Sequence, residues 1–278
     1  MQWEMRRVLI WGKTRPEVST KYNEIVCTGG VFEDTGRLVR LYPIPLRYLD
    51  DAKVFRKYQW IEAEVCKAPN DPRPESYRIR ADRIKVGELI KPGRGNWDER
   101  AKWILRPGNV IASVEEIQSR QAKEGTSLGL VRPKVVLDVA SVPFSKKEQE
   151  DFWSKYHAVV KNRDLPFDGI DQQPRKPLTP PDFRFKVRFA CNGDACSGSH
   201  EFSILDWEVD ALYFDQVAQG RSKSVARDKV IHKVEEICSP KNDLHLFLGN
   251  ISSYPQVFTV VGFWWPRRPE PPVKTLFD

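Results

Sequence analysis

The chain of 278 residues carries 45 Lys and Arg against 38 Asp and Glu, a net charge of +7, and 40% of its residues are hydrophobic. This composition can bury a core and excludes a wholly disordered protein. No apolar run reaches the roughly 18 residues of a membrane span, and the first residues lack a secretory signal pattern. Five cysteines are too few for a disulfide scaffold. We therefore expect a cytoplasmic protein without a membrane partner.

The excess positive charge lies in one half of the chain. Residues 1–140 contain 26 Lys and Arg and 19 Asp and Glu, whereas residues 141–278 contain 19 of each kind. A basic surface attracts phosphate backbones by releasing condensed counterions. The N-terminal half is thus the expected contact region for DNA or RNA. A charge of this size also serves solubility alone, so the charge does not decide the function by itself.

The N-terminal half has mainly strand patterns. Apolar or alternating segments predict strands or hairpins at 8–11, 25–44, 59–66, 77–79 and 127–142. Helical spacing is limited to 97–105 and 110–122. A sheet of this kind removes its edges when it closes, so we predict a barrel-like domain over residues 1–160.

The remainder predicts a mixed domain behind a linker. Residues 161–182 are rich in proline and predict an extended linker. Beyond it, a strand at 183–190 precedes a helix that begins near Asp206, a candidate N-cap. A second helix, capped by Ser224, and two closing strands complete residues 183–278. The fold class is therefore α+β, with a β-rich, barrel-like N-terminal half followed by a mixed α/β C-terminal half.

A Cys/His pattern lies in the loop between two predicted strands. Cys191, Cys196 and His200 have the spacing C-x4-C-x3-H. Thiolates and an imidazole suit tetrahedral zinc, so zinc is the cofactor that this pattern would hold. The alternative is reduced cysteines in a tight loop. A fourth ligand would have to come from elsewhere. The candidate donors are Cys238, His232 and His245.

Cys27 is the candidate catalytic residue. It precedes two glycines in the sequence V-C-T-G-G, where a nucleophile would have backbone amides close by. The first 156 residues contain no histidine, so its base would be His157 or a later histidine, with Glu24 or Lys13 as substitutes. The alternative is a small buried residue in a strand.

Basic and aromatic residues are interleaved in the N-terminal half. Such surfaces stack single strands or flipped bases, although the same residues also suit a solvated face over an aromatic core. The predicted nucleic-acid-binding residues are Arg37, Arg40, Tyr42, Arg47, Arg56, Lys57, Arg78 and Arg80. Glu62 and Glu64 share a strand face as in metal-dependent nucleases, but the usual acid–x–Lys ending is absent.

Several sequence blocks together resemble an uncharacterised family of bacterial proteins. The blocks are KTRPEVSTKYNEIVCTGG (13–30), RLVRLYPIPLRYL (37–49), KYQWIEAEV (57–65), DPRPESYR (71–78), SLGLVRPK (127–134), SILDWEVDALY (203–213), LHLFLGN (244–250) and VFTVVGF (257–263). The resemblance runs over most of the chain and implies that the two halves form one architecture. It also implies an association with mobile-element and phage-defence genes. It transfers no catalytic roles.

Three functional hypotheses follow. The favoured one is a nucleic-acid-binding protein that serves as a recognition component of an antiviral defence or DNA-modification system. The second is an enzyme acting on a nucleic-acid base or nucleotide, with Cys27 as nucleophile or a zinc site at Cys191, Cys196 and His200. The third is a structural partner of a protein encoded in the same operon.

Overall fold

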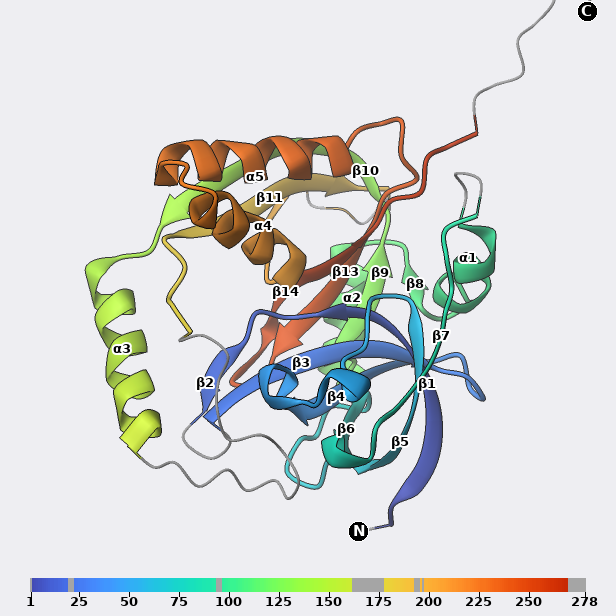
Figure 1. Ribbon diagram of the computed structural model, residues 1–278. Helices are drawn as coiled ribbons and strands as arrows, with labels where there is room; N and C mark the ends of the chain where they lie inside the picture. The colour runs from blue at the N-terminus through green and yellow to red at the C-terminus, as the bar shows by residue number, and fades with distance from the viewer. Residues whose placement is uncertain are drawn as a thin grey trace, which may run out of the picture.

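The computed structural model describes residues 2–19, 23–93, 97–161, 178–192, 196 and 198–269. It has an α+β architecture, with a barrel in the N-terminal half and mixed sheets and helices in the C-terminal half, so the predicted fold class is confirmed (Figure 1). Most of the predicted linker 161–182 lies outside the described residues. None of the helices in the described ranges is long and apolar enough to cross a membrane.

In the described chain, five strands close the barrel. They are β1 (Glu4–Lys13), β3 (Asn23–Phe32), β4 (Leu38–Ile44), β5 (Gln59–Lys67) and β6 (Ser76–Ile79). The pairing runs β1–β3–β4–β6–β5 and returns to β1. The β4–β6 pair is parallel, and the other pairs of this ring are antiparallel. Numbered along the chain, these strands have the order of the oligonucleotide- and oligosaccharide-binding (OB) fold, a Greek-key barrel.

Alternation along β4 shows how the sequence builds this barrel. Val39 and Leu41 are fully buried inside it, whereas Leu38, Arg40 and Tyr42 point to the outer face. Further pieces flank the ring. They are β2 (Glu17–Ser19), β7 (Lys85–Leu89) and the short 3-10 helices η1 (Leu46–Tyr48), η2 (Asp51–Lys53) and η3 (Ala81–Arg83).

The second part of the molecule combines two sheets with helices. Its strands are β8 (Val110–Ile111), β9 (Leu128–Val131), β10 (Pro133–Pro143), β11 (Phe183–Cys191), β12 (His200–Ser203), β13 (His245–Ile251) and β14 (Tyr254–Trp264). One sheet has the order β14–β13–β9–β8, and the other has the order β10–β11–β12. β9 and β10, which we expected in the N-terminal domain, therefore pair with C-terminal strands.

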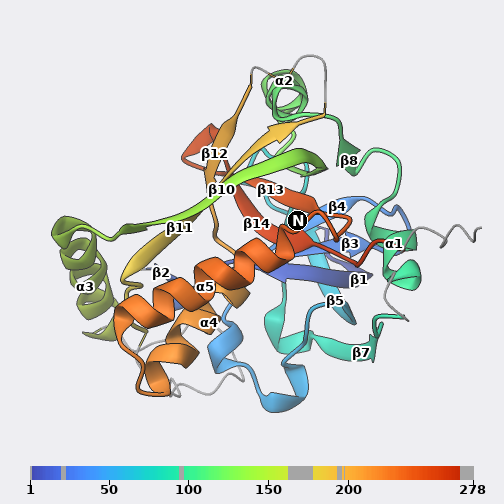
Figure 2. The ribbon, with the colours of Figure 1, turned by 90° about the horizontal axis from the view of Figure 1, so that it is seen from above.

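The helices cover these sheets and the edge of the barrel (Figures 1 and 2). They are α1 (Asp98–Ile104), α2 (Val114–Glu124), α3 (Lys146–Lys161), α4 (Trp207–Ala218) and α5 (Lys223–Ile237). Asp206 caps α4 as predicted, because its carboxylate accepts the Glu208 backbone N–H at 2.9 Å. The cap of α5 is Ser222 rather than the predicted Ser224, since the Ser222 hydroxyl reaches the backbone N–H of Val225.

An apolar interface joins the barrel to the second part. The indole of Trp11 on β1 stacks on Phe247 of β13, with ring centroids 4.0 Å apart and planes at 4°. Trp11 Nε1 donates to the carbonyl of Gly30 at 2.9 Å. A Cβ at Gly29 would lie 2.1 Å from the Trp11 ring, so only glycine leaves room for it. This contact explains Gly29, and Gly30 is required for a separate reason, because a Cβ there would lie 2.4 Å from Val8 Cγ1.

A buried ion pair crosses the same interface. Arg15, beyond β1, donates from Nε and Nη2 to the carboxylate of Asp210 on α4, at 2.6 and 2.9 Å. The Asp210 side chain is 2% exposed and that of Arg15 is 16% exposed. Burial raises the pKa of Asp210, and the guanidinium opposes that rise. Because both side chains are mostly buried, the charged form of each one is stabilised by the other.

Replacing Asp210 with alanine should destabilise the protein by about 3–5 kcal/mol, because Arg15 then remains mostly buried without its partner. Urea unfolding followed by tryptophan fluorescence measures this. The control is Asp228→Ala on α5, which removes the exposed Arg227–Asp228 pair and should cost less than about 1 kcal/mol. Equal effects of the two variants would contradict the structural role given to Asp210.

Candidate functional site

A cavity of about 420 Å³ lies between the two parts of the molecule. Its barrel wall is the outer face of β3 and β4, flanked by residues after β1 and by the loop between β5 and β6. Its opposite wall includes residues 250–253, where β13 turns into β14. OB barrels bind their ligands on the corresponding strand face and loops. The volume is typical of sites that enclose a small molecule or one group of a larger one.

Arg40 forms part of the cavity wall and ties three strands together. It is 8% exposed. Its Nη1 donates to the carbonyl of Asn250, and its Nη2 donates to the carbonyl of Ser127, both at 3.2 Å. Its Nε has no hydrogen-bond partner among the described residues. Burial lowers the pKa of Arg40. Arg40 thus places a buried positive charge at the cavity and holds β4 against the second part.

The loop between β5 and β6 is fixed by a second arginine. Arg73 donates to both carboxylate oxygens of Asp71, at 2.8 and 2.6 Å, and to the carbonyl of Asn250 at 3.1 Å. Burial acts to raise the pKa of Asp71, but the hydrogen bonds from Arg73 and Ser76 and the charge of Arg73 together lower it to about 2. Asp71 is therefore ionised at neutral pH, and the loop is anchored to the β13–β14 turn.

Cys27 borders this cavity from β3. Its backbone N–H donates to Thr14 Oγ1 at 3.2 Å, and its Sγ lies 3.9 Å from Arg40 Nη1. Burial raises the pKa of the Cys27 thiol in spite of the nearby guanidinium. Neither substitute base is free to serve it, because Glu24 pairs with Arg47 and Lys13 donates to a backbone carbonyl. The described lining of the cavity contains no histidine.

The predicted nucleic-acid-binding residues separate into three groups. Arg40, Tyr42 and Arg78 line the cavity. Arg37 and Arg56 are exposed. Three others contact carboxylates. These are Arg47 with Glu24 at 3.0 Å, Lys57 with Glu208 at 2.9 Å, and Arg80 with Glu64. The contribution of residues 250–253 had no signal in the sequence, because they lie more than 170 residues from the strands that they face.

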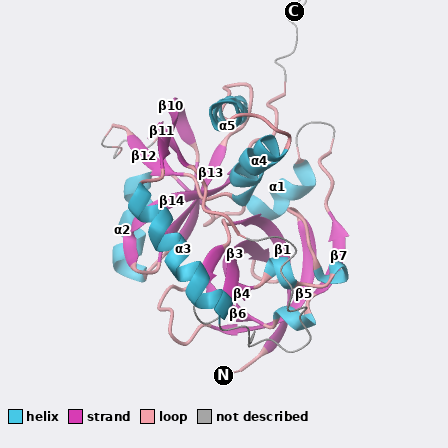
Figure 3. Ribbon diagram, turned by 60° about the vertical axis from the view of Figure 1, so that its left-hand side comes forward, coloured by secondary structure: helices cyan, strands magenta, loops and turns pink. Residues whose placement is uncertain are grey.

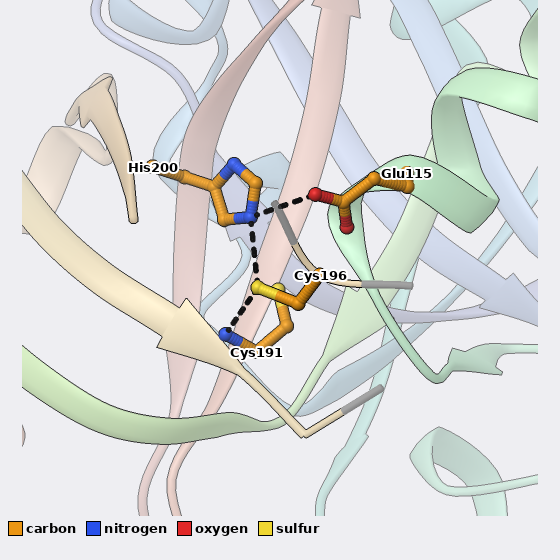
Figure 4. Close-up of side chains that lie close together, drawn as sticks. All are labelled: Glu115, Cys191, Cys196 and His200. Carbon is orange, nitrogen blue, oxygen red and sulfur yellow. Dashed lines mark hydrogen bonds and ion pairs between the residues drawn. The ribbon is translucent and has the colours of Figure 1, made fainter. Parts of the chain in front are cut away.

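A second group of side chains could hold a metal ion (Figure 4). Cys191 ends β11, Cys196 lies in the next loop, and His200 begins β12. Glu115 comes from the first turn of α2, and the four ligand atoms lie within 4.8 Å of one another. Cys196 Sγ is 3.5 Å from His200 Nε2, which is 3.4 Å from Glu115 Oε1.

The N-terminus of α2 contacts Cys191 beside this loop. Ser113 caps α2, and the next residue, Val114, donates its backbone N–H to Cys191 Sγ at 3.4 Å. Glu115 is therefore held beside the loop. It completes the described cluster in place of the expected donors Cys238, His232 and His245. A glutamate in the first turn of a helix gives no sequence signal of metal binding, since acidic residues are favoured there anyway.

The protein is thus an α+β protein with two parts. One is a barrel with OB strand order and a cavity on its outer face, and the other carries a Cys/His/Glu cluster. Residues 4–106 match the domain of unknown function DUF8758, and residues 110–278 match the domain of unknown function DUF8757. The chain belongs to the DUF8757 family, whose model covers more than half of it. Membership of an uncharacterised family, as predicted, is confirmed. A comparison with curated proteins finds no match.

The two matched regions meet between residues 106 and 110. In the structure this is the segment between α1 and β8, where the chain leaves the barrel and enters the second set of sheets (Figure 1). Figure 3 shows the barrel strands β1 and β3 to β6 below the strands β10 to β14 of the second part. The cavity is therefore built from both matched regions, whereas the four residues of the metal cluster all belong to the second one.

Proposed function

We propose that the protein binds nucleic acid and that the cavity receives a single base. The observation that carries this proposal is the position of the cavity, on the β3–β4 face of a barrel with OB strand order. Barrels of this kind use that face and its flanking loops to bind oligonucleotides. One fold serves many functions, so the chemistry of the cavity lining decides what this barrel binds.

The lining provides the groups that a base requires. Tyr42 is 40% exposed at the cavity and offers a ring for stacking. Arg78 adds a basic side chain, and Glu17 and Asn70 offer hydrogen-bonding groups to the edge of a base. Stacking of a base on an aromatic side chain contributes about 1–3 kcal/mol and tolerates different bases.

The packing of the two parts favours one unpaired base over a long strand or a duplex. Val31 and Leu38 on the outer face of β3 and β4 pack under Leu128 and Val261 of the second part. A nucleic-acid strand therefore cannot run along the whole face. A base that is paired in a duplex would first have to be unpaired and unstacked, which costs free energy. A pocket for one base suits a recognition component of a defence or DNA-modification system.

The cluster of Glu115, Cys191, Cys196 and His200 is proposed to bind zinc. A tetrahedral zinc with Zn–S of about 2.3 Å and Zn–N and Zn–O of about 2.0–2.2 Å separates S from N by about 3.5 Å and N from O by about 3.4 Å. The distances between the corresponding atoms here are 3.5 and 3.4 Å. Four protein ligands make a closed site, which is typical of structural zinc.

An enzyme that acts on the bound base is the second candidate, because Cys27 Sγ borders the same cavity beside Arg40. The raised pKa of Cys27 keeps the thiol protonated at neutral pH, and a nucleophile of this kind needs a base. Of the described lining, Glu17 is the carboxylate whose charge acts on the thiol, and it raises the pKa of Cys27 further. The geometry therefore favours binding over covalent chemistry.

Tyr42→Ala should weaken the binding of single-stranded DNA or RNA by about 5- to 150-fold, the equivalent of one lost stacking contact. Fluorescence anisotropy at about 50 and about 200 mM salt measures this and the expected salt dependence. Tyr42→Phe should bind like the wild type, and so should Tyr156→Ala on α3, which does not line the cavity. The proposal fails if the wild type binds no single strand at the lower salt concentration.

Purified protein should contain about one zinc per chain by mass spectrometry of the metals. Cys196→Ser and His200→Ala should lose it, whereas Cys238→Ser, outside the cluster, should keep it. A chelator should lower the Tm of the wild type but not that of His200→Ala, because a structural metal contributes its binding energy to folding. Zinc retained at full stoichiometry in both cluster variants would rule out these ligands.

Cys27→Ser should leave the affinity for single strands within about twofold, because the hydroxyl nearly reproduces the shape of the thiol and stacking supplies the larger contribution. The same preparations are incubated with the strand, which is then digested to nucleosides for mass spectrometry. A modified nucleoside that the wild type produces and Cys27→Ser does not would establish the enzyme candidate instead.

A further inference from the structure

A second cavity, of about 430 Å³, lies between the barrel and the start of α4. Lys13 at the end of β1 lines it, whereas the next residue, Thr14, lines the first cavity. Successive residues of an extended chain point to opposite sides, so β1 separates the two cavities. Phe55 and Trp207 give the second cavity apolar walls. The proposed function does not use this space.

Three cations that line the second cavity have no carboxylate partner among the described residues. Lys13 Nζ donates to the backbone carbonyl of Phe55 at 2.6 Å and lies 4.5 Å from the centroid of that ring. Arg56 is exposed at the cavity and makes no ion pair with a described side chain. Arg100 is the third and the most deeply buried, with 7% of its surface exposed.

Arg100 donates one hydrogen bond to a described residue and lies against two aromatic rings. Its Nε donates to the carbonyl of Ile90 at 2.8 Å, and its Cζ lies 4.0 Å above the ring of Tyr58. Among the described residues, its two Nη atoms have no hydrogen-bond partner. A buried guanidinium of this kind normally finds an acceptor for those donors.

The two carboxylates among the described lining residues, Asp206 and Glu208, both lie close to Lys57. Lys57 Nζ lies 2.9 Å from Glu208 Oε2 and 3.7 Å from Asp206 Oδ2, and Asp206 also caps α4. Two carboxylates therefore face four cations, which leaves a positive excess that an anion can neutralise. Burial lowers the pKa of Lys13 to about 8, although the charge of Glu208 opposes the change.

We propose that the second cavity is a ligand site for a phosphate-bearing anion, held by Lys13, Arg56 and Arg100. Arginine binds phosphate through two parallel N–H donors, and lysine adds a point charge. The apolar walls exclude water and strengthen these interactions. The phosphate could belong to a free phosphorylated small molecule or to a nucleic-acid strand bound at the first cavity.

Isothermal titration of the full chain with inorganic pyrophosphate tests the site. Lys13→Met and Arg100→Met should each weaken binding at least tenfold. The control Lys102→Met on α1 removes an exposed lysine that pairs with Glu99, and it should bind like the wild type. Lys13→Met should fold, because a methionine at this position removes a mostly buried charge. The absence of pyrophosphate binding at millimolar concentration, or unchanged affinity in Lys13→Met, would overturn the proposal.

The pH dependence gives a second readout, with sulfate as a probe that does not itself titrate between pH 7 and 9. Sulfate binding should weaken several-fold over this range in the wild type, because Lys13 loses its proton near pH 8, and it should stay constant in Lys13→Arg. The other charged groups facing the cavity are Arg56, Lys57, Arg100, Asp206 and Glu208. Burial raises the pKa of Asp206 to about 6, which lies below this range. Burial acts to lower the pKa of Lys57, but the carboxylates of Asp206 and Glu208 raise it above this range. A flat profile in the wild type would remove Lys13 from the site.

Competition identifies the source of the phosphate. If pyrophosphate displaces a single-stranded oligonucleotide, the strand supplies the phosphate. If it binds without affecting the oligonucleotide, the ligand is a free phosphorylated molecule. Pyrophosphate binding that Lys13→Met weakens supports the second site even when no oligonucleotide binds, so this test is independent of the proposed nucleic-acid function.

Discussion

The packing of Trp11 of the barrel against Phe247 of β13 fixes the positions of the two large cavities. The indole needs the space over Gly29 and stacks on Phe247, which holds the second part against the outer face of the barrel. Both large cavities flank this contact. Between them, beside Trp11 and Gly12, only a void of about 10 Å³ remains. The interface thus divides what would be an open barrel surface into two separate pockets.

The polar groups at the edge of this interface explain why the predicted basic surface is not continuous. Arg15 donates hydrogen bonds to Asp210, and Arg40 donates hydrogen bonds to backbone carbonyls of the second part. Each of these two cations joins the barrel to the second part. Part of the basic excess in residues 1–140 therefore holds the two parts together. Tyr42 and Arg78 line the first cavity, and Lys13, Arg56 and Arg100 line the second.

Local patterns in the sequence predicted most of the elements, and long-range contacts account for what it did not predict. Alternation predicted the barrel strands, and Asp206 was recognised as a cap because capping depends on neighbouring residues. The pairing of β9 with β13 depends on residues over 100 positions apart, so the sequence placed β9 with the wrong neighbours. For the same reason Glu115 was not predicted beside Cys191, although the C-x4-C-x3-H spacing was recognised.

The two cavities and the metal cluster differ in what a ligand would stabilise. Each cavity has walls from both matched regions, so an occupant binds only when the parts are docked and shifts that equilibrium toward the docked state. The metal cluster joins α2 to β11 and β12 within the second region alone. Its ion would stabilise that region whether or not a cavity is filled. Ligand binding and metal binding are therefore expected to contribute separately to stability, because they act on different contacts of the fold.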